Sequence, residues 1–456
     1  MEPPRILVAN DAGSRASLAF KGRRVKLLSS TYWSCGKMRV YIDGRAMGII
    51  DLNSPSVQWA VNVFTATGLS PGDHLLTLEA TRRVVGLPIL VIACTFLAYT
   101  YFGYPLLLAM LARFLPWRPT PDPSWEPRVT ICVAAYNAEA YIDAKLRSLV
   151  ALDYPPDKVE ILVYSDGSTD GTDGIVSRWE QRDPRVRLLR GGVRMGKPTG
   201  LNRMREEAVG EALVITDARQ IIDPRALRVL LSFLADPKVG CVTGNLLLEG
   251  GAGSGMYWRY ENWIRKQESR FRSVTGMTGP LSALRRCHLE PLPADIILDD
   301  VWIPMKLRLR GLRILLAENA IARDQAFPDA REFRRKVRTL AGNYQIFWRM
   351  PRLLIPFLNP SWFETISHKV ARLVCPWLLL VLFVACVIGE VEVATPPTER
   401  YILGGLLAGQ MGFYALALLG GRVGKVGNLA RTFSVLNAAA IVGLWRFVTG
   451  TQKITW

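Results

Sequence analysis

Side chains suited to phosphate chemistry stand at separated points of the sequence. The carboxylate of Asp166 can accept hydrogen bonds from a base or a ribose, and Gly167 after it lets a ligand approach the backbone closely. Lys197, which follows Gly196, offers a cation to a diphosphate. Asp217 is suited to a divalent ion that bridges two phosphates and makes a nucleotide a better leaving group. These residue types predict a site for a nucleoside diphosphate.

A second group of reactive residues lies downstream. Asp299 and Asp300 are adjacent carboxylates, and such a pair raises one pKa, which suits a general base that deprotonates an acceptor hydroxyl. We predict that Asp300 is this base; the alternative is an ordinary helix N-terminus, where acidic residues are stabilising. The group is completed by two flanking segments, Thr278-Gly279-Pro280 and Arg334-Arg335-Lys336-Val337-Arg338-Thr339.

Three apolar segments must position the first group. VTICVAA, VEILVYS and GEALVIT have the composition of buried strands, and AYIDAKLRSLVAL between the first two has helical spacing. Alternating strands and helices predict a parallel sheet, whose ligands bind beyond the carboxyl ends of the strands. A stretch such as DGSTDG alone is more typical of a helix-capping turn. Polar loops after all three strands favour a functional site, with the residues Tyr136, Asn137, Glu139, Asp166, Asp217 and Arg219.

Long apolar runs indicate a membrane protein. The chain has 456 residues, of which 50% are hydrophobic, and uncharged stretches near 20 residues are long enough to span a bilayer. Lys plus Arg total 57 against 39 acidic residues, a net charge of +18. Basic flanks of spanning helices account for this excess better than a nucleic-acid partner does. The three histidines are far apart, which argues against a histidine-rich metal site.

The composition predicts five regions. Residues 1–82 form a small extracytoplasmic antiparallel β unit, 84–115 a transmembrane helix, 116–330 a cytoplasmic α/β domain, 331–373 amphipathic interfacial helices, and 374–450 three transmembrane helices. The charge bias of the loops places the central domain in the cytoplasm, in a multi-pass protein of the inner (plasma) membrane. Residues 15–82 resemble β-sandwich modules of extracytoplasmic carbohydrate-active proteins; a β domain without a ligand is the alternative.

The ordered motifs AAYNAE, SDGSTD, MGKPTGLN, TDAR, GMTGP, LDD and RRKVRT resemble family 2 glycosyltransferases, the inverting group with the cellulose, hyaluronan and poly-N-acetylglucosamine synthases. The resemblance covers residues 84–450 and implies a GT-A fold. It also implies Tyr136, Asn137, Glu139 and Asp166 around the nucleotide, Lys197 near the diphosphate, Asp217 on a metal-nucleotide complex with Mg²⁺ or Mn²⁺, Asp299-Asp300 with Asp300 as catalytic base, and Thr278, Gly279 and Pro280 near the acceptor.

Two positions depart from that family pattern. The Asp-x-Asp metal motif reads Asp217-Ala218-Arg219, so a cation replaces one carboxylate, and Arg219 is expected to neutralise phosphate charge directly. Processive synthases carry Gln-x-x-Arg-Trp on the membrane-proximal helix, whereas this chain has Arg338 followed by Thr339. Arg338 can still bind the diphosphate, but without the tryptophan processive polymerisation is not expected.

The sequence thus predicts a membrane glycosyltransferase that moves a sugar from a UDP-sugar to a lipid-linked or growing saccharide in exopolysaccharide or envelope glycan synthesis. Membrane lipids are the other expected partners. One alternative is a non-catalytic protein that only binds nucleotide-sugars, with Arg219 marking lost chemistry. Another is a polyprenyl-phosphate glycosyltransferase, and a third makes the β unit a glycan-binding module with the rest as its anchor.

Overall fold

The structure, a computed structural model, describes residues 15–31, 37–52, 54, 56–81, 86–249, 255–325, 329–391 and 397–454. The chain divides into two compact units, one of residues 1–92 with 382–409 and one of residues 93–381 with 410–456. Each unit has a hydrophobic core of its own.

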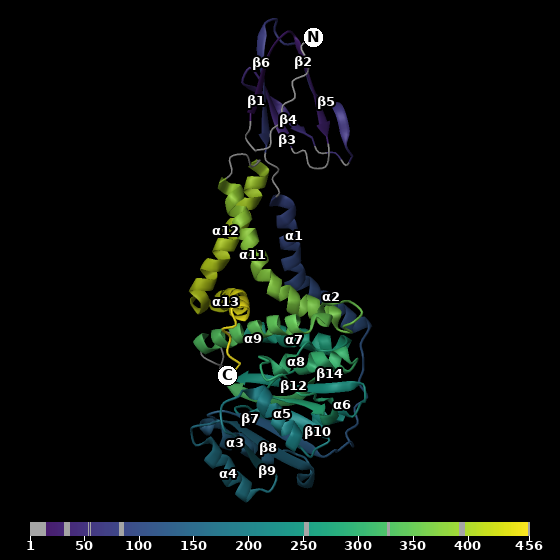
Figure 1. Cartoon of the computed structure of the whole chain (residues 1–456), viewed down its shortest axis with the longest axis vertical. Coiled ribbons are helices and arrows are strands. Elements are labelled where there is room, and N and C mark those ends of the chain that lie inside the picture. Colours follow the sequence, from purple (N-terminus) through teal and green to yellow (C-terminus); the bar gives the residue numbers. More distant parts are fainter. Residues whose placement is uncertain are drawn as a thin grey trace. The chain divides into compact units, whose positions relative to one another are not determined.

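The first unit contains the predicted antiparallel strands (Figure 1). They are β1 (Arg15–Lys21), β2 (Arg24–Thr31), β3 (Lys37–Ile42), β4 (Arg45–Asp51), β5 (Gln58–Thr67) and β6 (Asp73–Thr81). One sheet has the order β1-β6-β3-β4, and β2 pairs with β5. Asp43 and Gly44 have φ of 53° and 77°, as the predicted hairpin turn requires. Val40, Ile42, Ala66 and Leu76 form the core, to which both sheets contribute.

The second unit is built on an eight-stranded sheet of order β11-β14-β12-β13-β10-β7-β8-β9. The adjacent strands β10, β7, β8 and β9 are parallel, and β13 runs antiparallel to both of its neighbours. All seven residues of β7 are buried, as their continuous apolar run predicts. The strands are β7 (Val129–Ala135), β8 (Val159–Asp166), β9 (Val186–Gly191), β10 (Ala212–Asp217), β11 (Ile221–Ile222), β12 (Val239–Glu249), β13 (Ser282–Arg285) and β14 (Arg313–Gln325).

Helices cover both faces of this sheet, which gives the predicted α/β layers. Residues of β7 alternate between two cores: Ile131 packs with α3 (Glu139–Val150), α4 (Thr172–Arg182) and α6 (Ala226–Leu234). Cys132 packs on the opposite face. The helices on that face are α5 (Lys197–Glu207), α8 (Asp299–Leu309) and α9 (Asp329–Arg349).

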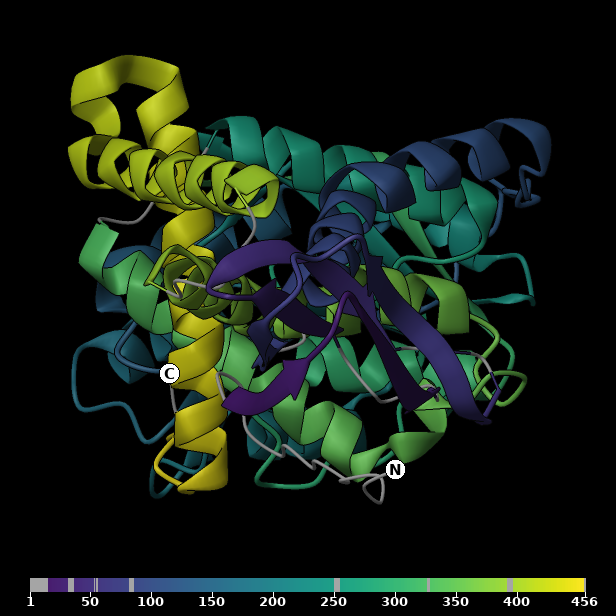
Figure 2. The ribbon, with the colours of Figure 1, turned by 90° about the horizontal axis from the view of Figure 1, so that it is seen from above.

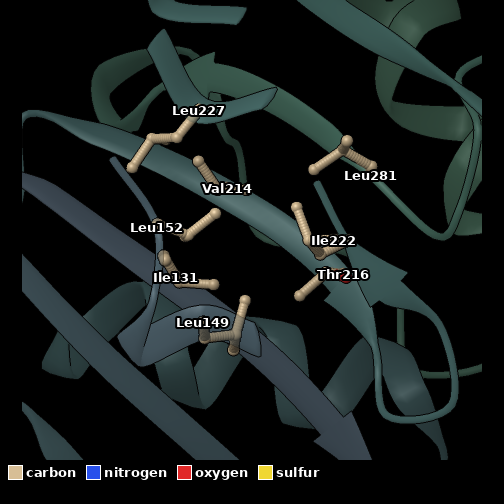
Figure 3. Close-up of a pocket in the computed structure, with 8 residues that line it drawn as sticks. All are labelled: Ile131, Leu149, Leu152, Val214, Thr216, Ile222, Leu227 and Leu281. Carbon is tan, nitrogen blue, oxygen red and sulfur yellow. The ribbon is translucent and has the colours of Figure 1, made fainter. Parts of the chain in front are cut away.

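A small gap lies inside the first of these cores (Figure 3). Its volume is about 10 Å³, and every lining side chain except Thr216 is apolar. A water molecule needs about 10–15 Å³ and several polar partners. This gap is therefore packing space between the sheet and its helices, not a ligand site.

Three helical stretches are long and apolar enough to cross a membrane: Ile89–Phe114, Trp362–Val391 and Arg400–Val448. The first joins α1 (Gly86–Ala98) to α2 (Tyr104–Phe114) through π-helical residues Tyr99–Gly103. The second contains α11 (Ala371–Val391), preceded by π-helical residues Thr365–Val370. The third combines α12 (Pro397–Leu419), a short 3₁₀ turn and α13 (Gly424–Val448).

The apolar run Val435–Val448, expected as a separate span, lies in α13. A Cβ added to Gly443 of α13 would lie 3.0 Å from the backbone N of Ala341 in α9, so the two helices pack at close range. Figure 1 looks along the axis of α13, and Figure 2 shows its full length in yellow. Small residues at this contact, such as Ala439 and Ala440, allow the close approach.

Candidate active site

The loops after β7, β8 and β10 lie at one edge of the sheet, because these strands are parallel neighbours. Helix α5 starts at Lys197, directly after Gly196, whose φ of 93° suits glycine. The Lys197 ammonium lies 2.8 Å from Oδ1 of Asp217 at the end of β10. It also lies 3.1 Å from Oδ2 of Asp299 at the start of α8. The carboxylates of Asp217 and Asp299, which are far apart in sequence, therefore both contact the buried cation of Lys197.

The pKa values in this cluster follow from burial and mutual charge. Burial disfavours the charge of Lys197, but Asp217 and Asp299 outweigh that effect and raise its pKa. Burial likewise opposes ionisation of Asp217, yet the ammonium of Lys197 lowers the pKa of this carboxyl. Both groups are therefore charged at neutral pH.

Asp300 has a different electrostatic environment. Burial and then the neighbouring Asp299 raise its pKa to about 6, against the opposing charges of Lys197, Lys369 and Arg338. Its buried Oδ1 has no hydrogen-bond partner among the described residues. A carboxylate with this pKa is ionised at neutral pH and can still take up a proton, which is what a general base requires.

The segment predicted to face the acceptor lies against the same cluster. A Cβ added to Gly279 would sit 3.4 Å from Oδ2 of Asp217 and 3.8 Å from the ammonium of Lys197. Thr278 is fixed through its hydroxyl, which accepts a hydrogen bond from Arg265 at 2.8 Å. The carbonyl of Pro280 accepts the Thr216 hydroxyl at 2.5 Å. Gly279 is thus the residue of this segment that approaches Asp217.

Asp166 holds the loop that leads to Lys197. Its two carboxylate oxygens accept the backbone N–H groups of Met195 and Gly196, each at 2.8 Å. The side chain is buried, with 1% of the residue exposed. In the structure this carboxylate is therefore engaged by protein, although it was expected beside a base or ribose.

The loops after β7 and β8 fasten to each other. The side-chain oxygen of Asn137, a residue with φ of 45°, accepts the Thr169 N–H at 2.9 Å. Oε2 of Glu139 accepts the Gly171 N–H at 2.9 Å. Next to them the guanidinium of Arg194 stacks on the Tyr136 ring, 3.6 Å from its centroid. Sequence reasoning missed Arg194, whose only signal was its place two residues before the Gly196-Lys197 pair.

Arg219 points to a different partner from the one expected. Its guanidinium donates to Oδ2 of Asp324 at 2.5 Å, and the side-chain amide of Gln220 donates to the same oxygen at 2.7 Å. Beneath this loop the buried side-chain nitrogen of Lys145 donates to the Thr216 hydroxyl at 2.6 Å and to the Gln220 carbonyl at 2.8 Å, and burial lowers its pKa to about 7. Lys145 was also missed, because in sequence it reads as a polar residue of an amphipathic helix.

Arg338 reaches the cluster from α9. It donates to the carbonyl of Ile297 at 2.8 Å, just before Asp299. Its positive charge adds to the effect of Lys197 in lowering the pKa of Asp217, and it partly opposes the burial that raises the pKa of Asp300. It also contacts the carbonyl of Ile454 at 3.4 Å. Arg338 therefore lies within electrostatic range of the carboxylates that the sequence singled out.

A divalent ion would find few protein ligands here. Among the described residues no group of three or more His, Cys, Asp or Glu side chains is arranged to hold a metal. Of the two carboxylates that contact Lys197, Asp217 is the more exposed, with 37% of its side chain accessible against 8% for Asp299. Because Mg²⁺ is often held by one or two carboxylates together with substrate phosphates, Asp217 suits a metal that arrives with the nucleotide.

Comparisons with known proteins identify a family for the central part of the chain. Residues 130–291 match the model of Glycosyl transferase family 2. The chain is similar to the beta-monoglucosyldiacylglycerol synthase of Synechocystis sp., with 26% identity over 242 residues, 49% of this chain and 50% of that protein. It is equally similar to the poly-beta-1,6-N-acetyl-D-glucosamine synthase of Staphylococcus aureus, with 26% identity over 196 residues, 41% and 47% of the two chains. The chain thus spans about half the length of the curated relatives it matches.

Among solved structures, the mannosyltransferase of Pyrobaculum calidifontis in complex with GDP-mannose and Mn²⁺ resembles the chain with a TM-score of 0.63. The two are 28% identical, and the match covers 79% of this chain and 99% of the other. The predicted family and the glycosyltransferase class are thereby confirmed for the matched residues 130–291, and the predicted GT-A-like fold is confirmed as well. Residues 130–291 are a Glycosyl transferase family 2 domain.

Proposed function

We propose that the chain is an inverting membrane glycosyltransferase that moves a sugar from a nucleoside-diphosphate sugar to the hydroxyl of a lipid-linked or growing saccharide. Support comes from the family 2 domain, from relatives named as a glycolipid synthase and a polysaccharide synthase, and from three apolar helical stretches. The same helices and the basic loops support a multi-pass place in the inner membrane with the catalytic domain in the cytoplasm.

The observation that carries this proposal is the position of Lys197 between Asp217 and Asp299, next to Asp300. Lys197 and Arg338 are proposed to stabilise the negative charge that develops on the departing diphosphate. Asp300 takes the proton of the acceptor hydroxyl as its oxygen attacks the anomeric carbon. The bond between that carbon and the phosphate oxygen breaks, and the nucleoside diphosphate leaves with the electron pair.

Asp217 is the residue we propose for a bound Mg²⁺ or Mn²⁺. Such an ion would supply a Lewis acid on the diphosphate oxygens. Gly279, with no side chain, leaves space in front of this carboxylate for the donor or the acceptor. Thr278 and Pro280 fix the backbone on either side of it.

For the nucleotide we propose two kinds of contact. Tyr136 and its stacking partner Arg194 are planar groups that can hold a base, with Asn137 and Glu139 bracing the loops. Asp166 acts through the Met195–Gly196 backbone and so positions Lys197. Arg219 forms an ion pair with Asp324 that supports the loop after Asp217. This pair explains how the loop tolerates a cation in place of the second carboxylate of the metal motif.

The direct test uses the full chain purified in detergent with Mn²⁺ or Mg²⁺ and a panel of UDP- and GDP-sugars. We expect nucleotide release that depends on one donor, on the metal and on Asp300, with Asp300→Asn at background turnover and near-normal donor affinity. Binding of the donor without release would instead support the non-catalytic alternative. Product mass from native membranes separates a lipid monophosphate acceptor from a saccharide one, and single from repeated transfer.

A further inference from the structure

A cavity of about 150 Å³ with both apolar and charged lining side chains lies beside α9 in the second unit. Its walls come from α7 (Gly255–Phe271), α9, α13 and the two π-helical segments, which supply Tyr101, His368 and Lys369. A single water needs only about 10–15 Å³, so the cavity admits a much larger group. π-Helical turns occur frequently at functional sites.

The charges around this cavity are unequal. Glu261 is its one lining carboxylate, and it pairs with Arg372 and with His368. Lys336 pairs with Glu332 at 3.5 Å. Lys369 has no ion pair within 4 Å among the described residues. His368 also pairs with Glu268 at 2.6 Å. Lys369 is therefore the lining cation without a direct ion-pair partner among the described residues, and an anionic ligand group can pair with it.

Three residues that line the cavity also carry buried polar atoms without a hydrogen-bond partner in the described part of the chain. These atoms are Nε and Nη2 of Arg372 and the side-chain oxygens of Asn343 and Asn437. Buried polar atoms of native proteins are nearly always satisfied. The nitrogen donors suit phosphate oxygens, and the amide oxygens suit hydroxyl groups.

Lys369 connects the cavity to the candidate base. A Cβ added to Gly276 would lie 3.8 Å from the Lys369 ammonium and 3.7 Å from the backbone carbonyl of Asp300. Helix α9 contributes to both places: Arg338 donates to the carbonyl of Ile297 beside the carboxylates, and Lys336 and Asn343 line the cavity. A ligand held at Lys369 would thus have its neighbouring atoms near Asp300.

Each of the three candidate membrane spans contributes residues to the lining of the cavity. The first contributes Tyr101, the second Lys369 and Arg372, and the third Phe433 and Asn437.

From these observations we propose that the cavity binds the phosphate of an amphiphilic acceptor, with the acceptor hydroxyl directed to Asp300. This rests on the proposed function, and it assigns the acceptor to the phosphate-linked glycolipids. The presence of the candidate base Asp300 favours a hydroxyl as the attacking group, because a terminal phosphate is already ionised at pH 7 and would need no base.

The test measures binding of radiolabelled dodecyl phosphate to the full chain in a non-ionic detergent, with inorganic phosphate and dodecanol as competitors. We expect Lys369→Met to weaken binding at least tenfold, Lys369→Arg to restore it, and UDP or GDP affinity to stay unchanged in both. Lys266→Met, which removes a cation paired with Glu318 outside the cavity, should match the wild type.

Equal affinity in the wild type and Lys369→Met would overturn the proposal, and so would competition by inorganic phosphate as strong as by unlabelled dodecyl phosphate. No binding by a folded wild type, judged by its melting temperature, also overturns it. Asp300→Asn should bind dodecyl phosphate normally. The absence of sugar transfer with intact dodecyl phosphate binding would count against the proposed function alone.

Discussion

Nζ of Lys197 lies 2.8 Å from Oδ1 of Asp217, and both groups are held in their charged forms. The pair joins the start of α5 to the end of β10, so a donor diphosphate at this edge would meet a fixed cation. Such a preorganised charge costs no reorganisation when negative charge develops on the leaving group.

Lys197→Met should lower kcat by about 10²–10³, the usual cost of losing one stabilising donor in an active site. The variant also leaves Asp217 and Asp299 without their shared cation, so its melting temperature must be recorded beside its nucleotide-release rate. Lys266→Met is the matched control, since Lys266 pairs with Glu318 on an exposed surface. A kcat within threefold of the wild type would remove Lys197 from the mechanism.

The pH dependence of kcat/KM should report Asp300. Its pKa is raised to about 6, and a base acts only when ionised, so kcat/KM should fall as the pH is lowered through about 6. In Asp299→Asn the neighbouring negative charge that raises this pKa is gone, and the acid limb should move to lower pH. An unchanged limb in Asp299→Asn would mean that another group titrates.

Asp166→Asn should raise the KM for the donor about tenfold while changing kcat little. An amide has one oxygen, so one of the two buried N–H groups of Met195 and Gly196 loses its acceptor, at a cost of about 1–3 kcal/mol. Asp122→Asn is a suitable control, because Asp122 accepts a local N–H on an exposed loop. Loss of kcat with an unaltered KM would contradict the positioning role.

Arg219→Ala should destabilise the fold by about 1–3 kcal/mol, because it leaves buried Asp324 with fewer donors. Donor KM and kcat should remain within about threefold of the wild type. Thermal unfolding and steady-state kinetics of the same preparation measure both effects. A tenfold rise in donor KM would instead place Arg219 on the diphosphate, as its position in the motif first suggested.

The strand ends were predictable because a parallel sheet collects the loops after successive strands at one edge. That rule placed Asp217 at the end of β10, and the continuous burial of β7 and β8 follows from their apolar runs. It could not show what a side chain contacts. Asp166 binds backbone and Arg219 binds Asp324, and both outcomes depend on how loops fold after the strands end.

The cavity beside α9 was out of reach of sequence reasoning for a different reason. Its residues come from helices with no regular spacing relative to one another, so no local pattern connects Lys369 with Asn343. The buried side chain of Lys145 could not be predicted either, because one lysine in an amphipathic helix is ordinarily solvated.

Helix α9 carries Arg338, which contacts the segment before Asp299, and Asn343, which lines the cavity. On the proposed acceptor site, exchanging Asn343 and the other cavity-lining side chains of α9 would alter acceptor choice while Arg338 is kept. Evolution has the same freedom, and a single helix of this kind allows one transferase scaffold to diversify its products without rebuilding its catalytic machinery.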